Sequence, residues 1–314
     1  MRSCRSLPQR HTKRHPPWSG ASRVEECDRI VFTSDSVVLG QFRCPPSYAD
    51  FPMAGRIHYH LTAFPHRAVW IEREDAGRFV ADPGLATLYN PGQAYQRRSI
   101  SRHGDESDWI GMSEAVARDI VRHFSDGDAD REAPLCFFRA PVANEVYMAQ
   151  QALFERALHP ESDALEIEES AIAIVSAVLR GAYDGAGRGR CRQLASRGTE
   201  LVEAAKSVIM ATLFENLSVS DLAKRIGVSV FHLCRTFRGA TGSTLHAYRR
   251  DMRLRTAANL TRTYRGHLAA LALEVGFYSH SHFSAAFRRA FGRAPSLQAL
   301  GSDLGSAEAP RPRA

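Results

Sequence analysis

The sequence predicts a multidomain protein of mixed α and β structure, with an N-terminal antiparallel β-barrel flanked by helices and a C-terminal all-α domain. Short segments rich in Val, Ile, Phe, Tyr and Trp, separated by Pro and Gly turns, fill residues 29–112. Four glycines lie close together in residues 181–191, as is typical of a linker. From about Thr199 onward, apolar residues recur with helical spacing. With 314 residues, the chain is long enough for two such domains.

The N-terminal tail is basic. Residues 1–23 contain six Lys or Arg and no acidic residue, and no apolar signal-peptide segment follows them. We interpret residues 1–23 as a disordered tail or as the result of a start codon placed too far upstream, and a nucleic-acid-binding arm is the alternative. No run of about 18 apolar residues is present, so no membrane association is expected.

Residues 24–180 are predicted to form a sensor or dimerisation domain. Its strands are expected in IVFTSDSVVLGQF (30–42), YHLTAF (59–64), AVWIERE (68–74), RFVADPGLATLYN (78–90) and SDWIGM (107–112). Helices are expected in SEAVARDIVRHF (113–124), ANEVYMAQQALFERAL (143–158) and ESDALEIEESAIAIVSAVLRGAY (161–183). The last helix carries an apolar stripe of Leu165, Ile172, Val175 and Leu179, which packs either on its own barrel or on a second copy of the chain.

Charge divides the chain at the predicted linker, residues 181–198. Residues 24–198 contain 19 basic and 26 acidic side chains, whereas residues 199–300 contain 14 basic and six acidic ones. The resulting balances of −7 and +8 predict that only the second domain, residues 199–300, meets a polyanion. Residues 301–314 are expected to be a disordered tail.

A helix interrupted by glycine opens the basic domain. In LAKRIGVSVFHLCRTF (222–237), a helical apolar pattern stops at Gly227 and restarts on a new phase. Glycine adopts the positive φ of a tight turn without a Cβ penalty, and Ala223, four residues earlier, lets two steeply crossing helices approach closely. Ser218 with Asp221 is expected to cap the first helix, and Ser229 the second. This pattern predicts a helix-turn-helix unit.

The same pattern recurs in LALEVGFYSHSHFSAAF (271–287). Leu222, Ala223, Ile226 and Gly227 reappear 49 positions later, as Leu271, Ala272, Val275 and Gly276. Leu233 and Phe237 reappear 50 positions later, as Phe283 and Phe287, so one extra residue falls in the second turn. Two units in register on a basic segment indicate a duplicated DNA-binding element.

A continuous helical pattern, LHAYRRDMRLRTAANLT (245–261), joins the two units. Its 17 residues would span about 25 Å as a helix. A rigid connection of this length could place two recognition helices in successive major grooves on one face of the duplex.

The sequence GFYSHSHFSAAFRRAFGRAPS (276–296) resembles the signature of the AraC/XylS transcriptional regulators, and the resemblance extends over about residues 199–298. Members show Gly-Phe-x-Ser-x-Ser-x-Phe, then Phe-Arg/Lys and Phe-Gly-x-x-Pro. The resemblance implies a seven-helix domain with two helix-turn-helix units joined by a long helix. It also implies that the protein is a cytoplasmic regulator whose partners are double-stranded DNA, a small effector, RNA polymerase if it is an activator, and a second copy if it dimerises.

Base contacts in the first unit are expected from the outward positions of its second helix. The resemblance places Phe231, Cys234 and Arg235 against bases. Arg235 is the prime specificity residue, because a guanidinium can bond guanine O6 and N7 together. Phe231 can contact a thymine methyl group. Cys234 either packs or has a redox role, and Arg238 either contacts phosphate or lies on a solvated face.

The second unit offers His280, Ser281 and Ser284 as base-reading candidates. Ala285 stands where many members have arginine, so this unit should read sequence weakly or mainly hold the backbone. His280 and His282 diverge on a helix, so they are not expected to share a metal. Phosphate contacts are predicted for four further arginines, namely Arg250, Arg253, Arg288 and Arg289.

The first domain resembles the cupin-like barrels found in this family, most clearly at GLATLYNPGQAY (84–95). The resemblance implies that an effector binds inside the barrel. A pocket could be lined by Tyr59, Trp70, Tyr89 and Tyr95, although each is also suited to the core or the surface. An architectural DNA binder whose barrel only dimerises is an alternative.

A metal-dependent cupin enzyme is the other alternative. His58 and His60 fit its ligand pattern, but Phe64 stands where an acid is expected and no histidine follows Pro91-Gly92. We therefore expect no enzymatic activity, no metal and no cofactor. None of the six cysteines forms a CxxC pair, which favours a reduced, cytoplasmic setting.

Overall fold

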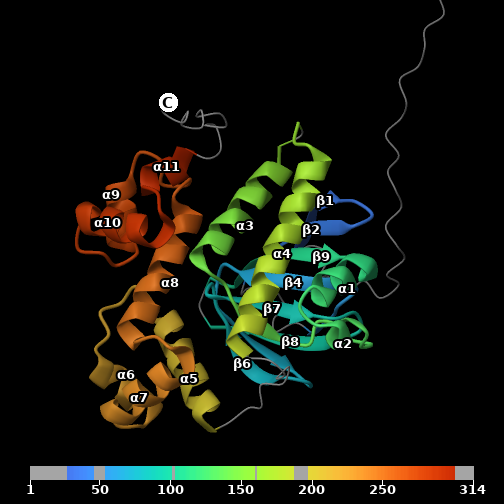
Figure 1. Ribbon diagram of the computed structural model, residues 1–314. Helices are drawn as coiled ribbons and strands as arrows, with labels where there is room; N and C mark the ends of the chain where they lie inside the picture. The colour runs from blue at the N-terminus through green and yellow to red at the C-terminus, as the bar shows by residue number, and fades with distance from the viewer. Residues whose placement is uncertain (1–26, 46–53, 101–102, 160, 187–196, 301–314) are drawn as a thin grey trace, which may run out of the picture.

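The computed structural model describes residues 27–45, 54–100, 103–159, 161–186 and 197–300. The predicted tails, 1–23 and 301–314, and residues 187–196 of the predicted linker lie outside the described residues. The N-terminal part is built from antiparallel sheets with flanking helices, and the C-terminal part is all helical (Figure 1). The predicted fold class is confirmed.

Ten strands form two antiparallel sheets within the described part of the chain. The six-stranded sheet has the order β1-β2-β9-β4-β7-β10, and the four-stranded sheet has the order β3-β8-β5-β6. The strands are β1 (Asp28–Thr33), β2 (Val37–Cys44), β3 (Ala54–Arg56), β4 (His60–Pro65), β5 (Val69–Arg73), β6 (Gly77–Ala81), β7 (Leu85–Tyr89), β8 (Ala94–Ser99), β9 (Asp105–Met112) and β10 (Arg139–Pro141). Sequence patterns missed β3, β8 and β10, which are short or polar.

Two long helices cross the sheets in Figure 1, α3 (Asn144–Ala157) and α4 (Ala164–Ala186), while α1 (Glu114–Arg122) and α2 (Asp126–Ala129) lie at one side. Val175 and Leu179 of α4 are buried in the core of the protein's own first domain, whereas Leu165 is 62% exposed. The helix continues through residues 181–186, where a linker was predicted. It continues because Ala182 is buried and Tyr183 stacks on Phe124.

Seven helices make up residues 197–300, as the family resemblance implies. They are α5 (Arg197–Ala211), α6 (Val219–Ile226), α7 (Val230–Thr241), α8 (Leu245–Leu260), α9 (Leu268–Glu274), α10 (His280–Phe291) and α11 (Pro295–Leu300). In Figure 1, α8 runs between a lower group, α5 to α7, and an upper group, α9 to α11.

Both helical groups share hydrophobic cores with the first domain. The larger core joins the six-stranded sheet, α3 and α4 to Leu254 and Ala257 of α8 and to the buried side chains of α9 and α10. A second core joins Ala68 and Val80 of the sheets to α5, α6, α7 and α8. The two domains are therefore packed together rather than tethered.

Cys27, Cys44 and Cys234 are not in disulfide bonds, whereas Cys136 is disulfide-bonded. The expectation of fully reduced cysteines is wrong at Cys136, since a disulfide depends on distance in the fold and not on spacing along the chain. Among the described residues, no helix combines the length and the apolarity that crossing a bilayer requires.

Candidate nucleic-acid interface

The first helix-turn-helix unit is α6, a three-residue turn and α7. Gly227 ends α6 with φ +81°, a left-handed conformation that only glycine adopts without strain. Its N–H donates to the Ala223 carbonyl (2.9 Å), and the Val228 N–H donates to the same oxygen (3.1 Å). These bonds satisfy the carbonyls left open at the end of a helix. Ala223 is buried, and Gly227 has the positive φ that a tight turn requires.

The second unit, α9 to α10, repeats this turn with one more residue. Gly276 has φ +80°, and the Phe277 N–H donates to the Ala272 carbonyl at 2.8 Å. Ala272 is fully buried. Four residues, 276–279, separate Val275 from α10, whereas three residues, 227–229, separate Ile226 from α7. The inserted residue therefore lies in the turn, where the sequence comparison places it.

Serine hydroxyls begin both second helices. The Ser229 Oγ accepts from the His232 N–H at 3.2 Å, and the Ser279 Oγ accepts from the His282 N–H at 3.2 Å. Each cap fixes where its helix begins, and so which side chains of the first two turns project outward.

The outward face of α7 carries the predicted base-reading residues of the first unit. Leu233 and Phe237 are fully buried, and they turn the opposite side of the helix to the surface. Phe231 is 74% exposed although it is a large apolar residue. Neighbouring Val230 is 43% exposed, and contiguous exposed apolar side chains are typical of contact surfaces. Cys234, Arg235 and Arg238 are also exposed.

The outward face of α10 is smaller and more polar. Phe283 and Phe287 are fully buried, while His280 and Ser281 are exposed. Ser284 is half-buried and lies 3.2 Å from His280 Nε2, so these two candidates form a hydrogen-bonded pair. Exposed Ala285, Arg288 and Arg289 complete this face.

Tyr278 is a candidate contact residue that the sequence patterns missed. It immediately precedes the cap of α10, is 90% exposed, and lies beside His282 with ring centroids 6.5 Å apart. The signal in the sequence was its place directly before the serine that caps α10, between buried Phe277 and that cap. A tyrosine at this place can stack on a sugar or donate to a phosphate.

The arginines of α8 differ from one another in the structure. Arg250 is 43% exposed and pairs with Asp251 at 3.0 Å. Arg253 was predicted to contact phosphate, but all three of its guanidinium nitrogens bond backbone carbonyls of the protein. That prediction missed the role that the fold gives Arg253, because the carbonyls come from segments distant in the sequence. Arg255 is 6% exposed and belongs to the domain interface.

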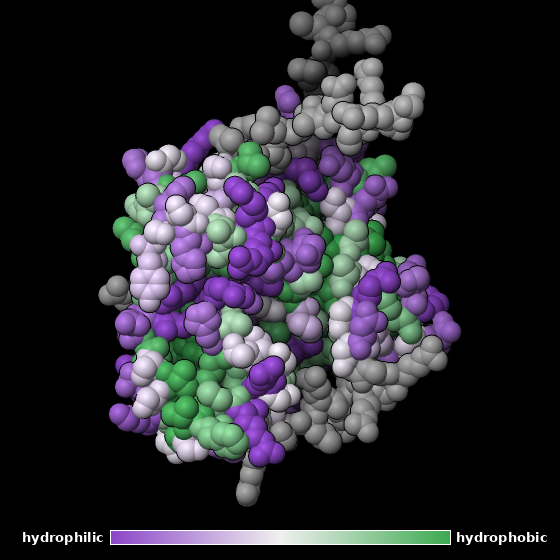
Figure 2. Space-filling view, turned by 60° about the vertical axis from the view of Figure 1, so that its left-hand side comes forward, coloured by the Kyte–Doolittle hydropathy of each residue, from purple (hydrophilic) through white to green (hydrophobic). Residues whose placement is uncertain are grey.

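Figure 2 shows the face on which the helical domain lies. Its upper part is mainly hydrophilic, while an apolar area lies in its lower part, at the level of the first unit. The exposed apolar side chains of that unit are Val219, Val230 and Phe231, and exposed Phe214 lies in the segment before it.

The aromatic residues proposed for an effector pocket make separate ring contacts. Tyr59 stacks on Trp109 with centroids 6.1 Å apart, whereas Tyr89 pairs with Tyr95 at 5.3 Å. Trp70 packs against the core shared with α5, and Arg78 lies 4.1 Å from its ring. The strands place these side chains in separate clusters, and a shared pocket in the barrel stays a prediction.

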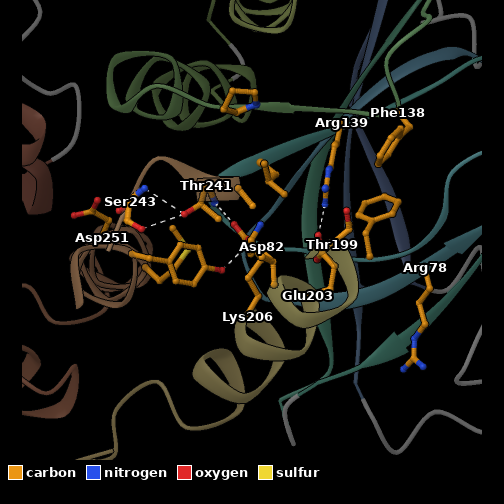
Figure 3. Close-up of a pocket in the computed structure, with 18 of the residues that line it drawn as sticks. Arg78, Asp82, Phe138, Arg139, Thr199, Glu203, Lys206, Thr241, Ser243 and Asp251 are labelled. Atoms are coloured by element: carbon orange, nitrogen blue, oxygen red, sulfur yellow. Dashed lines mark hydrogen bonds and ion pairs between the residues drawn. The ribbon is translucent and has the colours of Figure 1, made fainter. Parts of the chain in front are cut away.

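A cavity of about 580 Å³ lies between the two domains. Figure 3 shows residues of β6, β10 and α5 around it, with Arg139 reaching toward Glu203 and Asp82 lying near Lys206. Phe79, Phe138 and Met252 give it an apolar side. No pattern in the sequence indicates this site, because its residues come from segments that lie far apart along the chain.

Buried polar bonds close this junction. Asp82, 1% exposed, accepts from Lys206 Nζ at 3.1 Å and from the Tyr248 hydroxyl at 2.9 Å. Burial, together with the Asp82 carboxylate, raises the pKa of Tyr248 well above its usual value, so Tyr248 donates as a neutral phenol. Glu203 accepts from the Val80 N–H at 2.7 Å and from Arg139 at 2.6 Å.

Arg255 provides a further tie between the domains. It donates to the Pro83 carbonyl at 2.7 Å, to the Val142 carbonyl at 2.5 Å and to Asn144 Oδ1 at 2.9 Å. The orientation of α8 is therefore fixed by the first domain.

His60, part of the pattern that suggested a metal enzyme, is a buried side chain. Its Nδ1 lies 3.3 Å from Asn90 Oδ1, and burial lowers its pKa, which favours the neutral ring. Among the described residues, no group of three or more His, Cys, Asp or Glu side chains is arranged to hold a metal ion.

Comparison with known proteins agrees with this geometry. The family described as "Helix-turn-helix domain" matches residues 222–297. The regulatory protein SoxS of Salmonella typhimurium is 40% identical over 80 residues, which are 26% of this chain and 75% of SoxS. The transcriptional regulator Rob of the same organism is 33% identical over 91 residues, or 29% of this chain and 32% of Rob.

A solved AraC-type regulator from Chromobacterium violaceum is 28% identical, with a TM-score of 0.32. The match covers 34% of this chain and 96% of that regulator's chain. ToxT from Vibrio cholerae is 9% identical, with a TM-score of 0.37. The match covers 85% of this chain and 98% of the ToxT chain. Neither structure carries the assignment, which depends on the sequence matches and on the two helix-turn-helix units. The chain belongs to the AraC/XylS family of DNA-binding transcriptional regulators.

Proposed function

We propose that this regulator reads one bipartite DNA site through α7 and α10 and changes its DNA binding when a small molecule occupies the cavity between its domains. The observation that carries the first part is the pair of capped, exposed second helices on one basic domain. Docking of each in a major groove would require two elements separated by about one helical turn, or roughly 10 base pairs.

In the first unit, Arg235 is proposed to read a guanine and Phe231 to contact a thymine methyl group, with Cys234 packed between them. In the second unit, His280, Ser281 and Ser284 are proposed to read bases weakly, because Ala285 offers only a methyl group. Four exposed arginines, namely Arg238, Arg250, Arg288 and Arg289, are proposed to contact phosphates, each adding about −0.9 to the slope of log affinity against log salt.

Selection of bound fragments from genomic DNA tests this proposal. Full-length protein should enrich a sequence with two conserved elements about one turn apart, the better-defined element belonging to the first unit. Enrichment without a shared sequence, or of a single element only, would contradict bipartite reading. The operator found in this way also shows whether the site has the symmetry expected for a homodimer and whether it overlaps the RNA polymerase site of an activated promoter.

The cavity favours a second component, which is control by an effector. Its walls come from both domains, so a molecule bound there would contact the β6–β7 turn together with α5 and α8. A volume of about 580 Å³ suits a small molecule, since ligand sites commonly measure about 300–1,000 Å³. A ligand with differential affinity for two arrangements of these elements would shift the DNA-binding equilibrium.

A cavity-filling substitution tests the effector site. Ala76 lines the cavity, so Ala76→Trp should abolish any change in operator affinity caused by a small-molecule cell extract. Ala173→Trp, at an exposed position of α4, is the matched control and should respond as the wild type does. An unchanged response in Ala76→Trp would show that the effector, if one exists, binds elsewhere.

A further inference from the structure

Arg253 joins the segment that leads into the first helix-turn-helix unit to the turn of the second unit, through backbone carbonyls. Its Nε donates to the Leu213 carbonyl at 2.7 Å and its Nη2 to the Glu215 carbonyl at 3.2 Å, both in the segment between α5 and α6. Its Nη1 donates to the Gly276 carbonyl at 2.8 Å, in the turn of the second unit. A single planar guanidinium therefore bonds the segment before α6 and the turn of the second unit at once.

Arg249, one helical turn earlier on α8, strengthens the attachment to the first unit. Its three guanidinium nitrogens donate to the carbonyls of Leu213 (3.2 Å), Leu217 (3.1 Å) and Thr212 (3.3 Å). These carbonyls follow the C-terminus of α5, where the helix dipole favours a cation. We call Arg249 and Arg253 together the α8 arginine clamp. Only Arg253 of the clamp reaches the second unit.

The turn of the second unit is built around this guanidinium. A Cβ placed on Gly276 would lie 2.7 Å from Arg253 Cζ, which is closer than real Cβ contacts allow. A Cβ placed on the equivalent Gly227 would meet no atom within 4 Å. Both glycines have positive φ, so Gly276 satisfies a steric requirement that Gly227 does not share.

We propose that Arg253 is a positioning residue that fixes α10 relative to α7 and thereby sets the separation of the two DNA elements that the protein accepts. This inference rests on the proposed function, in which both units read DNA. One base pair moves the second element by about 3.4 Å along the duplex and about 35° around it. A rigidly placed α10 cannot follow that movement, whereas an α10 released from Arg253 can adjust to it.

The experiment uses the operator selected from genomic DNA and two versions of it, with one base pair inserted or removed between the elements. Full-length wild type should lose about tenfold or more in affinity on either altered operator, comparable to the loss of one good base contact. Arg253→Ala should bind all three operators within about threefold of one another, a tolerance worth well under one such contact. The affinities for the three operators are measured on one protein preparation, so the fraction of active protein cancels from their ratios.

Three variants separate positioning from a phosphate contact. Arg253→Lys keeps a charge for phosphate but replaces three fixed donors, each on a different carbonyl, with one compact ammonium on a flexible stem, so it should behave more like Arg253→Ala than like the wild type. His246→Ala, at an exposed position of the same helix, should keep the wild-type ratios. If Arg253 served a phosphate, Arg253→Ala would weaken all operators equally, reduce the salt slope by about 0.9, and be restored by lysine; that outcome would overturn the proposal.

The two glycines provide an independent comparison. Gly227→Ala and Gly276→Ala impose the same kind of φ strain, but only Gly276→Ala displaces Arg253 and should relax the spacing requirement. Equal spacing ratios in the two variants, or a wild type that tolerates the altered operators, would refute positioning by Arg253. If the wild type instead showed no preference for any DNA sequence, the proposed function would be refuted.

Discussion

Arg235 is the residue on which the proposed sequence preference depends most. It is exposed near the start of α7, two positions after the buried Leu233 that turns this face outward. A guanidinium in a major groove bonds guanine at two acceptors, and the contact discriminates against other bases by about 1–3 kcal/mol.

Arg235→Ala should therefore weaken binding to the selected operator by about 1–3 kcal/mol and relax the preference at one base position. Binding to random DNA should change little. Arg235 makes no specific base contact on random DNA, so only the small effect of losing one positive charge remains. Titrations of operator and random duplexes at the same salt concentration measure both effects. An equal loss on the two duplexes would assign Arg235 to phosphate.

Gly227 is the residue on which the first unit depends for its geometry. A β-branched residue resists a φ of +81°, so Gly227→Val should destabilise the turn by about 1–3 kcal/mol. A lower melting temperature together with weaker operator binding is expected. If both quantities matched the wild type, the left-handed turn would not be needed for the unit.

At the scale of the element, α3 is held to the six-stranded sheet by a buried charged cluster. His66 Nε2 lies 3.0 Å from Asp108 Oδ2, and Gln150 of α3 donates to the same oxygen at 2.6 Å. Burial opposes the charge on His66, but the Asp108 carboxylate prevails and raises the histidine pKa above 6.5. Burial likewise opposes the charge on Asp108, and His66 with its hydrogen bonds lowers the carboxyl pKa below 3.8.

The pair predicts a pH window of stability. A raised histidine pKa stabilises the fold fully below pH 6.5, and this contribution is lost as pH rises through the folded value. A lowered carboxyl pKa stabilises fully above pH 3.8, and this contribution is lost as pH falls through the folded value. Urea unfolding from pH 6 to 9 should show declining stability in the wild type and a flatter profile in His66→Gln. Parallel profiles would exclude His66 as the cause.

The elements of the helical domain could be predicted well from the sequence, since each is specified by residues close together in the chain. Ser218, Gly227 and Ser229 define boundaries of the first unit through local bonds, and the duplication located the second unit. The strands β8 and β10 could not be predicted, because their residues are polar or few. The roles of Arg253 and Asp82 depend on partners from distant segments, which no local pattern reveals.

At the scale of the whole molecule, the buried pair of Asp82 and Lys206 couples the domains. Removing one partner of a buried ion pair leaves an uncompensated charge, at a cost of about 3–5 kcal/mol. Lys206→Met should therefore destabilise the protein strongly, and adding Asp82→Asn should recover part of the loss. A double-mutant cycle by urea unfolding measures the coupling, and strictly additive effects would mean that the two side chains do not interact.

The packing of α8 against the first domain limits how freely this regulator can be recombined. Leu254, Ala257 and Ala258 are almost fully covered, and Arg255 has its guanidinium bonded to carbonyls of the barrel side. A chain truncated to the helical part would leave this stripe and a charged group facing water. A chimaera that attaches the helical domain to a foreign sensor domain must therefore supply a surface of matching shape, with hydrogen-bond acceptors for Arg255. A chimaera joined by a flexible linker alone would leave the apolar stripe exposed and would be aggregation-prone and poorly soluble.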